Sequence, residues 1–556
     1  MKIEIKINNK KIKTESGKTV LEVALENKID IPALCYHPDL KIKGSCRLCL
    51  IQVKGKKNLT TSCSTKVVSG MEVLTETSEI ERARKINLEL LFSQHREECF
   101  DCVWDSNCEL LRLAKKYNVE INRFKDRKTK YPVYRFGNAL EFDSSKCIDC
   151  GNCVEVCHNQ GVDFLETKER GHLFQVVPSK KKDKDCIYCG QCVTHCPAGA
   201  FEAVGEYEGI EESLNKKDKV VVFQFAPSIR TIIKEGQIVA GLKKLGVDKV
   251  FDTCVGADFT TTSEAEEVVE RIKSGKNLPI LTSCCPSWVK YVEQNYPEFI
   301  PNLSTTRSPQ VILGGLIKTY WAEKEGIDPK KIFVVSIMPC VSKKFEIERP
   351  QLKISGMKAV DYVLTTREFQ RLLKRHNIDL ETLKPEKTDL GFGDPSGAGI
   401  IYGASGGVME SAFRTAYEKL TNEKLKDVEF KQVRGMKGVK EVEIKIKGEK
   451  KKIAVINGLG NAKKLIDDIK SGKRGGYTCI EVMACPGGCI GGGGQPLPTS
   501  EEIRSQRASS LYQRDKKEKI RKAHENPIVK KVYEKLAHEV LHTSYNKKGK
   551  GTVKKI

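Results

Sequence analysis

The chain has 556 residues, of which 39% are hydrophobic and 30% charged, a composition typical of a globular protein with roughly three to five domains. No apolar run approaches the ~18 residues that a spanning helix needs, so we expect no membrane association. The N-terminal sequence MKIEIKINNKKIK alternates Ile with polar residues, which is typical of a strand and unlike an export signal. The sequence therefore predicts a cytoplasmic protein.

Twenty-two cysteines and a formal net charge of +23 narrow the class of function. Because cytoplasmic thiols stay reduced, clustered cysteines in such a protein indicate metal binding rather than disulfides. A basic surface can bind nucleic acid, but Lys and Arg are spread along the whole chain and no nucleic-acid-binding motif is present. We expect an acidic protein partner or an ordinary solvated surface, and no nucleic acid.

Residues 1–78 predict two short strands, a helix over Thr19 to Asn27, and four cysteines with the spacing C-x10-C-x2-C-x13-C. These are Cys35, Cys46, Cys49 and Cys63. Four thiolates at this spacing suit zinc or iron. Cys35 precedes YHP and Cys46 lies within GSCRLC, and this arrangement resembles the 2Fe-2S module of hydrogenases and of the large NADH dehydrogenase subunit. The resemblance implies a β-grasp ferredoxin domain that holds one 2Fe-2S cluster.

Residues 79–140 begin with a predicted helix over Ile80 to Phe92 and continue into the spacing His-x3-Cys-x2-Cys-x5-Cys. The potential ligands are His95, Cys99, Cys102 and Cys108. A single histidine is more often a packed or surface residue, but imidazole is a competent iron ligand and this one sits at ligand spacing. The same two families carry this pattern, so we expect a small helical domain with a 4Fe-4S cluster held by one His and three Cys.

Residues 141–208 contain an internal repeat with the spacing C-x2-C-x2-C-x3-C. The repeat comprises Cys147, Cys150, Cys153 and Cys157, then Cys186, Cys189, Cys192 and Cys196. In two-cluster ferredoxins the fourth cysteine of each run ligates the other cluster, so we expect the first three to share a 4Fe-4S cluster with Cys196 and the second three with Cys157. His158 replaces the proline that often follows the fourth cysteine, and we expect only a local effect.

Residues 209–500 change to strands alternating with amphipathic helices, which predicts a large α/β domain. The expected strands are Lys219 to Phe225, Pro279 to Ser283, Lys331 to Met338, Ala359 to Thr365, Lys452 to Asn457 and Tyr477 to Met483. Ligand sites in such sheets gather at the carboxyl ends of strands. Three cysteine motifs follow strands in this way, TSCCPSW, MPCVSKKFE and EVMACPGGCIGGGGQP. Separate loops could therefore bring four thiolates to one cleft. Residues 501–556 are basic and largely helical, and are expected to form a C-terminal tail packed on this domain.

Each motif alone has an ordinary interpretation, a buried cysteine or a flexible glycine turn. In this order, however, they closely resemble the three signatures that hold the active-site cluster of FeFe hydrogenases, a likeness that covers nearly the whole chain. The resemblance implies a 4Fe-4S cubane held by Cys285, Cys340, Cys485 and Cys489. Cys489 would also bridge to a di-iron unit that carries carbonyl, cyanide and dithiolate ligands.

The same resemblance assigns residues around that cluster. Lys343 would donate a hydrogen bond to a cyanide, and Met338 would pack against the di-iron unit. The pocket would also be lined by Ala226, Pro227, Ser228 and Met483. Ser287 replaces the glycine usual after Cys-Cys-Pro, which would change loop geometry or polarity without loss of a ligand.

Hydride chemistry at a buried metal needs a path for protons. The resemblance implies a relay formed by Cys284, Glu264, Ser304, Glu267 and Arg271. Independently, Ser263-x-x-Glu266 looks like a capping box that opens a helix, with Glu264, Glu267 and Arg271 along one side. Charged residues beside an apolar stripe are usually just solvated, which is the ordinary alternative. Cys254 and Cys479 lie in or beside predicted strands and are expected to be buried structural thiols.

The fold class expected is therefore a multidomain α+β and α/β protein. Its implied function is reversible oxidation of hydrogen gas and reduction of protons, with electrons exchanged with ferredoxin or a similar acidic carrier. The implied cofactors are one 2Fe-2S cluster, three accessory 4Fe-4S clusters and the active-site cluster, and the di-iron unit implies maturation proteins as further partners.

Two other functions fit part of the sequence. Residues 1–205 would suit an electron-transfer subunit of an NADH or formate dehydrogenase, but the C-terminal motifs argue against it. A hydrogenase-related iron-sulfur scaffold would keep the cubane ligands, but retention of Cys284, Lys343, Met338 and Glu264 argues against that. Gly458-x-Gly460 is incomplete as a dinucleotide fingerprint, so electrons are expected to arrive through a protein. The direction of the reaction, membership of a larger complex and oxygen tolerance are left open.

Overall fold

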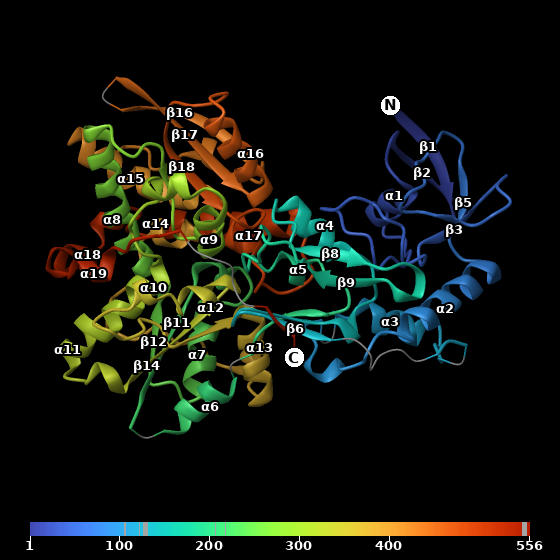
Figure 1. Ribbon diagram of the computed structural model, residues 1–556, viewed down its shortest axis with the longest axis horizontal. Coiled ribbons are helices and arrows are strands. Elements are labelled where there is room, and N and C mark those ends of the chain that lie inside the picture. Colours follow the sequence, from blue (N-terminus) through green and yellow to red (C-terminus); the bar gives the residue numbers. More distant parts are fainter. Residues whose placement is uncertain are drawn as a thin grey trace.

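The computed structural model describes residues 1–104, 107–121, 123–125, 132–205, 207–216, 218–446, 448–547 and 553–555. The remaining residues of the chain lie outside the described residues. They fall within the predicted segments 79–140, 141–208, 209–500 and 501–556. Figure 1 shows a large part with two sheets at one end, a smaller sheet near the N-terminus at the other, and the cysteine-rich segments between them.

The N-terminal sheet has the strand order β2-β1-β5-β3-β4. Its strands are β1 (Lys2–Ile7), β2 (Lys10–Glu15), β3 (Leu50–Val53), β4 (Thr60–Thr61) and β5 (Glu72–Leu74). The Ile residues of β1 are buried and its polar residues mostly exposed, as the alternating pattern predicts. Helix α1 (Val20–Glu26) begins at a capping box between Thr19 and Glu22. The two predicted strands and the helix are confirmed.

The middle of the chain preserves the cysteine repeat as a structural repeat. Its elements are α2 (Ser78–Phe92), α3 (Glu109–Lys116), β6 (Val133–Phe136), β7 (Leu140–Asp143), α4 (Asn152–Asn159), β8 (Leu165–Lys168), β9 (Gln175–Pro178), α5 (Gln191–Thr194) and β10 (Phe201–Ala203). Helices α4 and α5 each begin directly after a left-handed glycine, Gly151 at φ 72° and Gly190 at φ 70°. Since only glycine adopts this conformation without strain, both halves turn into their helix in the same way.

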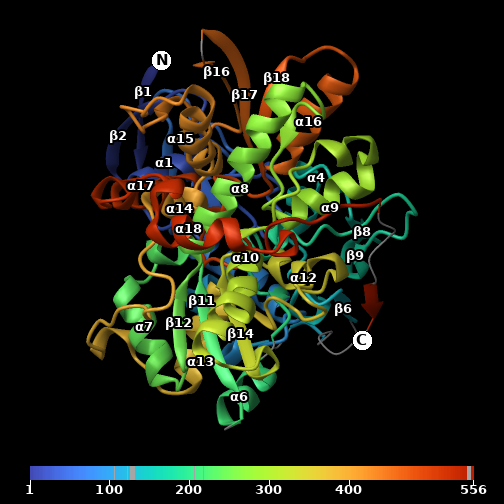
Figure 2. The ribbon, with the colours of Figure 1, turned by 90° about the vertical axis from the view of Figure 1, so that its left-hand side faces the viewer.

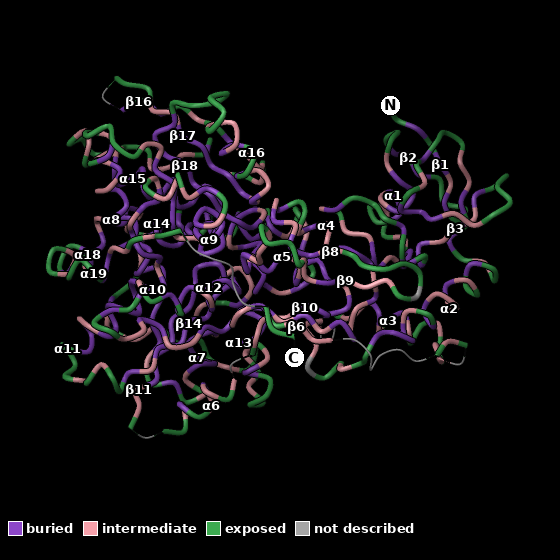
Figure 3. Tube along the Cα trace, in the orientation of Figure 1, coloured by how far each residue is buried: buried purple, intermediate pink, exposed green. Residues whose placement is uncertain are grey.

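Two four-stranded sheets form the large part. One has the order β12-β11-β14-β15 and is parallel, whereas the other has the order β13-β18-β17-β16 with β16 antiparallel to β17. The strands are β11 (Val220–Phe225), β12 (Lys249–Asp252), β13 (Ile280–Leu281), β14 (Ile332–Met338), β15 (Tyr362–Thr365), β16 (Val439–Ile446), β17 (Glu449–Asn457) and β18 (Tyr477–Met483). All six predicted strands are present. Their central residues are buried (Figure 3).

Sequence analysis missed β12 and β16 and the division into two sheets. Strand β12 has four residues between two helices, too few for a periodic signal. Strand β16 alternates Val and Ile with Lys and Glu because one of its faces is exposed at a sheet edge. Strand order depends on long-range pairing, which no local pattern encodes.

The helices around these sheets are α6 (Tyr207–Asn215), α7 (Glu235–Lys244), α8 (Thr253–Ser274), α9 (Pro286–Asn295), α10 (Pro309–Leu316), α11 (Ala322–Glu325), α12 (Ser342–Glu346), α13 (Thr366–Arg375), α14 (Gly397–Ile400), α15 (Gly407–Thr421) and α16 (Leu459–Lys470). The predicted capping box at Ser263 is wrong. Helix α8 begins at Thr253, where the Asp252 side chain accepts from the Cys254 N–H at 2.8 Å. Ser263 instead lies within the helix and bonds Thr306 and His542.

The described part of the C-terminal segment crosses between the two sheets. Its elements are α17 (Glu501–Lys517), α18 (Pro527–Val532), α19 (His538–Leu541) and β19 (Val553–Lys555). In Figure 2, α17 and α18 lie between the sheet of β16, β17 and β18 above and that of β11, β12 and β14 below. Strand β19 extends the sheet of the cysteine repeat by pairing with β6.

A buried ion cluster attaches α17 to α15. Arg414 donates to both carboxylate oxygens of Asp515 at 2.8 Å and to Glu410 at 2.7 Å, and all three side chains are fully buried. Arg434 donates to both oxygens of Glu410, and Arg521 donates a further hydrogen bond to Asp515. Buried carboxylates of this kind depend on their partner, because an unpaired charge in the interior is strongly unfavourable.

Arg414→Ala should therefore lower the free energy of unfolding by about 3–5 kcal/mol, measured by urea denaturation followed by circular dichroism. Lys463→Ala is the control, because Lys463 forms a half-exposed ion pair with Asp467 and should cost less than about 1 kcal/mol. Equal effects of the two substitutions would contradict the role of the cluster.

Candidate active site

Three loops meet in one cavity between the two sheets. Cys285 follows β13 and is the N-cap of α9, Cys340 lies between β14 and α12, and Cys485 and Cys489 follow β18. The wall of this cavity is formed almost entirely by apolar surface. The predicted convergence of separate strand ends is therefore what the fold produces.

Every residue that the sequence assigned to the cluster pocket lines this cavity. They are Ala226, Pro227, Ser228, Cys284, Cys285, Met338, Cys340, Lys343, Met483, Cys485 and Cys489. Four residues of the predicted relay do not line it: Glu264, Glu267, Ser304 and Arg271. Ser287 also lines the cavity, so the departure from glycine adds a buried hydroxyl to its wall.

The chemistry of the four thiols fits a cationic metal cluster. Burial, followed by the neighbouring Cys340, raises the pKa of Cys285 to about 11 and that of Cys489 to about 12. A thiol ligates metal as the thiolate, and a bound metal ion supplies the positive charge that removes the proton. Four thiols held in one dry cavity therefore suit iron better than any role as free thiols.

The glycines of the third motif permit close approach rather than flexibility. A Cβ at Gly488, which has φ 93°, would lie 2.6 Å from Met483 Sδ and 2.7 Å from the Ser405 nitrogen. A Cβ at Gly492 would lie 2.3 Å from the Pro339 carbonyl oxygen. These contacts place the loop that carries Cys489 directly against the loop before Cys340, so the flexible-turn interpretation is wrong.

Lys343 is held at the cavity wall by a residue that sequence analysis did not single out. Its ammonium group donates to the carboxylate of Glu346 at 2.9 and 3.1 Å and to the Cys284 carbonyl oxygen at 3.1 Å. Burial alone would lower the pKa of Lys343, but Glu346 and nearby thiols raise it, so the lysine stays charged. Gln310 lines the cavity and also donates to Glu346, at 2.6 Å. Glu346 lies in the MPCVSKKFE motif, three residues after the lysine, which is the signal that could have identified it.

Three of the predicted relay residues, Ser304, Glu267 and Arg271, contact one another. Ser304 donates to Glu267 at 2.7 Å, and Arg271 donates to the other oxygen of the same carboxylate. Glu264 is 4% exposed and Arg271 8%. Both side chains are therefore buried, so the ordinary interpretation of a solvated helix face does not apply to them.

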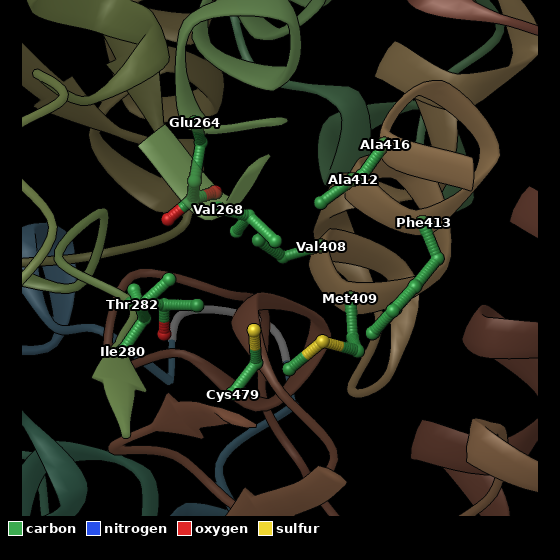
Figure 4. A pocket seen from close by; sticks show the side chains of 10 residues that line it. All are labelled: Glu264, Val268, Ile280, Thr282, Val408, Met409, Ala412, Phe413, Ala416 and Cys479. Atoms are coloured by element: carbon green, nitrogen blue, oxygen red, sulfur yellow. The ribbon is translucent and has the colours of Figure 1, made fainter. Parts of the chain in front are cut away.

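Glu264 borders a small apolar cavity (Figure 4). Val268, Val408, Met409 and Phe413 line the same cavity. Burial first, then the charges of Glu267 and Glu481, raises the pKa of Glu264 to about 8. Burial and then Glu264 also raise the pKa of Cys284 well above its usual range. Both groups can therefore hold a proton near neutral pH.

The cysteine repeat brings its members together across the two halves. Cys157 lines one cavity with Cys186, Cys189 and Cys192. For the other set, burial and then the charge of Cys196 raise the pKa of Cys150 to about 12. This arrangement agrees with the crossed ligand sets expected for two clusters. His158 is exposed and pairs with Asp163 at 2.6 Å, so its effect is local.

The two N-terminal sets of candidate ligands differ in burial. Cys35, Cys46, Cys49 and Cys63 are buried, and hydrogen bonding with Cys46 lowers the pKa of Cys35 while hydrogen bonding with Cys63 lowers that of Cys49. In the second set, His95 is buried with Nδ1 2.8 Å from the Lys146 carbonyl oxygen. Its companions Cys102 and Cys108 are partly buried, whereas Cys99 is exposed.

Successive ligand sets are joined by direct contacts. The Trp104 indole, two residues after Cys102, donates to the Cys196 carbonyl oxygen at 2.8 Å. A Cβ at Gly493 would lie 2.7 Å from Gly190 Cα, so the turn after Cys189 touches the loop of Cys489. The Cys485 thiol also lies 3.9 Å from the Cys189 carbonyl oxygen. These contacts join the segment of Cys102 to the cysteine repeat, and the repeat to the cavity.

The two cysteines without a ligand role are buried, as expected. Cys254 lies in the first turn of α8 and accepts from Arg230 at 3.4 Å, and Cys479 lies within β18. The expectation that Cys254 lies in or beside a strand is met by its position directly after β12. Both are 3% exposed or less.

The raised pKa of Glu264 makes stability depend on pH. Between about 4.5, the ordinary value, and about 8 the unfolded chain loses this proton while the folded chain keeps it, so wild-type stability falls as pH rises. Glu264→Gln removes this dependence and should gain stability relative to wild type across that window, measured by urea unfolding. Glu266→Gln, at a more exposed position on the same helix, is the control for loss of a carboxyl. A stability difference independent of pH would contradict the assignment.

Comparison with known proteins identifies five matching regions. Residues 219–493 match the C-terminal domain of the iron-only hydrogenase large subunit, and residues 501–548 match the iron hydrogenase small subunit. Residues 1–78 match a 2Fe-2S cluster binding domain, residues 146–200 a 4Fe-4S dicluster domain, and residues 84–123 the NADH-ubiquinone oxidoreductase-G iron-sulfur binding region.

Similar proteins cover nearly the full chain. The NADP-reducing hydrogenase subunit HndD of Solidesulfovibrio fructosivorans is 39% identical over 98% of this chain and 99% of its own length, and iron hydrogenase 1 of Clostridium pasteurianum is 38% identical over 97% and 99%. The cytosolic iron-sulfur assembly component 3 of Rattus norvegicus is 31% identical over 69% of this chain and 90% of its own length. An apo structure of the [FeFe]-hydrogenase HydA1 of Chlamydomonas reinhardtii superposes with a TM-score of 0.56 and 36% identity, covering 62% of this chain and 99% of that one.

Among the described residues, no helix is long and apolar enough to cross a membrane. The large part has the FeFe hydrogenase fold, and the preceding regions are iron-sulfur domains. Homologues of this kind are oxidoreductases. The fold, the cysteine-lined cavity and the similarity over nearly the whole length of the chain show that it belongs to the iron-only (FeFe) hydrogenase family.

Proposed function

We propose that the protein reversibly oxidises hydrogen gas and reduces protons in the cavity between its two sheets. The observation that carries this proposal is that all eleven residues expected around the active-site cluster, from four separate segments, line one cavity. The proposed ligands of the active-site 4Fe-4S cluster are Cys285, Cys340, Cys485 and Cys489. With its di-iron unit, which carries carbonyl, cyanide and dithiolate ligands, this cluster supplies the metal chemistry when bound.

The proposed accessory ligands form four sets. They are Cys35, Cys46, Cys49 and Cys63 for a 2Fe-2S cluster; His95, Cys99, Cys102 and Cys108; Cys147, Cys150, Cys153 and Cys196; and Cys157, Cys186, Cys189 and Cys192, each of the last three for a 4Fe-4S cluster. The proposed domains are residues 1–78, 79–140, 141–208 and 209–500, with a C-terminal segment 501–556. Contacts between neighbouring sets, such as Gly190 against Gly493, support a chain of clusters that carries electrons to and from the cavity.

The cavity wall provides one fixed positive charge and several apolar contacts. Glu346 holds the Lys343 ammonium group where it faces both the cavity and the Cys284 carbonyl, so the lysine can donate to an anionic ligand of the cluster. Met338 and Met483 supply soft apolar contacts. Burial of these groups excludes bulk water and strengthens the electrostatic interaction of Lys343 with whatever it binds.

Protons are proposed to pass between Cys284 and the protein surface along the predicted relay through Glu264, Ser304 and Glu267, with Arg271 holding the Glu267 carboxylate in place. Glu264 keeps a proton near neutral pH because its surroundings are apolar. Ser304 and Arg271 orient the carboxylate of Glu267 from two sides. Cys284 lines the cavity directly, so it is the group that would exchange a proton with the reacting centre.

Electrons are proposed to be exchanged with ferredoxin or a similar acidic carrier. A formal net charge of +23 attracts such a carrier over long range. HndD is named as NADP-reducing, and a pyridine nucleotide would then be reached through a partner protein. Maturation proteins that build the di-iron unit are a second class of partner.

A scaffold for iron-sulfur assembly is the second candidate, because one similar protein is named as an assembly component. Such a role needs cluster ligands but not a charged lysine or a proton path. The Lys343 to Glu346 pair and the buried carboxyl of Glu264 favour catalysis.

Infrared spectroscopy on protein produced with maturation proteins tests whether the protein is a hydrogenase or an assembly scaffold. Carbonyl and cyanide bands, roughly 20 iron atoms per chain and hydrogen turnover with a reduced dye are the expected results. Protein made without maturation should lack the bands and the turnover. A fully matured protein with neither bands nor turnover would favour the scaffold.

The adjacent residues Cys284 and Cys285 are proposed to have different roles, proton transfer and metal ligation. Substitution can distinguish the two roles. Cys285→Ser should reduce the iron content, because Cys285 is a proposed ligand. Cys284→Ala should keep the iron and the infrared bands while turnover falls at least ~10²-fold, the low end for a positioned acid-base group. Cys284→Ser should not restore turnover, because a hydroxyl has a far higher pKa. A loaded Cys284→Ala protein with near wild-type turnover would refute the relay.

A further inference from the structure

The outer end of the proposed relay lacks an obvious proton exchanger. Arg271 donates to four backbone carbonyl oxygens, those of Asn277, Pro301, Asn302 and Leu303, at 3.0–3.3 Å, besides its pair with Glu267. A guanidinium group is always protonated in proteins and cannot pass on its proton. Arg271 thus positions Glu267, and another group must exchange protons between that carboxylate and solvent.

The C-terminal segment places a histidine beside the same carboxylate. Thr306 and His542 form an antiparallel bridge, flanked by Arg307 N–H to the Leu541 oxygen at 2.7 Å and Thr543 N–H to the Thr305 oxygen at 2.8 Å. Arg307 Nε also donates to the His542 carbonyl oxygen at 2.8 Å. These backbone bonds fix the position of His542, although it lies 275 residues from Glu267 in sequence.

The His542 ring connects the relay with the surface. Nδ1 lies 3.0 Å from the Thr305 hydroxyl, and the Thr305 N–H donates to both oxygens of Glu267 at 3.0 and 3.1 Å. Nε2 lies 3.3 Å from the Ser263 hydroxyl. On its outer side the ring stacks on that of His538 at 4.5 Å, and His538 is exposed to solvent.

Charged groups surround this histidine on every side. Burial lowers the pKa of His542 below its ordinary 6.5, and His538 and Arg307 act in the same direction, whereas Glu266 and Glu267 oppose them. The Tyr533 hydroxyl, which also lies here, donates to Glu266 at 2.7 Å. A ring with these neighbours can take a proton and release it again.

We propose that His542 is the group through which the relay exchanges protons with solvent, with His538 as its outer partner. This inference rests on the proposed function. The proton passes between the ring and the Glu267 carboxylate on the side of Thr305, whose hydroxyl faces Nδ1 and whose N–H donates to that carboxylate, and the ring takes the proton up from solvent or releases it there. No electron moves and no bond other than those to hydrogen changes. The C-terminal segment thereby contributes directly to proton transfer as well as to packing.

His542→Gln tests the proposal, because glutamine can keep hydrogen bonds to Thr305 and Ser263 but cannot carry a proton at neutral pH. Iron content and infrared bands should be unchanged. Turnover with a reduced dye should fall roughly tenfold, less than for a group at the reacting centre, and the pH profile should lose the inflection due to this ring. The turnover of His542→Ala should fall to a similar extent. Added imidazole should restore the turnover of His542→Ala but not that of Cys284→Ala.

His376→Ala is the matched control, since His376 is exposed and pairs with Glu211 far from the relay, and it should behave as wild type. The turnover of His538→Gln should also fall, but by less than that of the His542 variants. Because His538 is exposed, this variant tests the proposal even if the His542 variants fail to load iron. Carbethoxylation of His542, followed by peptide mass spectrometry across pH, reports its pKa without turnover and should give a value below 6.5.

Wild-type turnover in the loaded His542 and His538 variants, with no response to imidazole, would overturn the inference alone, provided that Cys284→Ala is inactive. A matured wild-type protein with neither infrared bands nor turnover would overturn the proposed function and this inference with it. The two failures are therefore distinguishable.

Discussion

The thiols of Cys285, Cys340, Cys485 and Cys489 lie in one buried cavity, where loss of contact with water raises the pKa of at least Cys285 and Cys489. Ionised thiolates are stable there only with a cation between them. The same desolvation keeps Glu264 protonated near neutral pH and makes the charge of Lys343 depend on Glu346. Exclusion of water thus sets the chemistry of the cluster pocket, of its lysine and of the proton path together.

Excluding water requires close contact between segments that are remote in sequence. Gly488 and Gly492 let the third loop approach Met483 and Pro339 where any Cβ would collide. Gly190 and Gly493 bring the cysteine repeat against the same loop. The proposed route for electrons and the exclusion of water therefore depend on the same glycine contacts. This dual use explains why a glycine-rich segment is rigid here rather than a flexible turn.

The C-terminal segment completes the large part in two ways. Asp515 on α17 neutralises Arg414 on α15, so the segment is bound through buried charges. Farther along, His542 is clamped against Thr306 by backbone hydrogen bonds. The similarity of residues 501–548 to a separate iron hydrogenase small subunit indicates that such an element can be either a separate chain or a continuation of the large one. In this protein, continuity fixes its position beside the proposed relay.

The sequence by itself determined the elements and the ligand candidates, because cysteine spacing, strand periodicity and the Thr19 cap are local patterns. It predicted the six strands from β11 to β18 that carry clear apolar runs, and it placed the three motifs at strand ends. It misplaced the start of α8 at Ser263, since polar Thr and Ser residues inside a buried helix look like a terminus. Only the tertiary structure decided that two sheets rather than one enclose the cavity, that Glu346 holds Lys343, and that His542 reaches Thr305. These contacts join residues far apart in the chain or depend on burial, and neither distance nor burial is written in a local pattern.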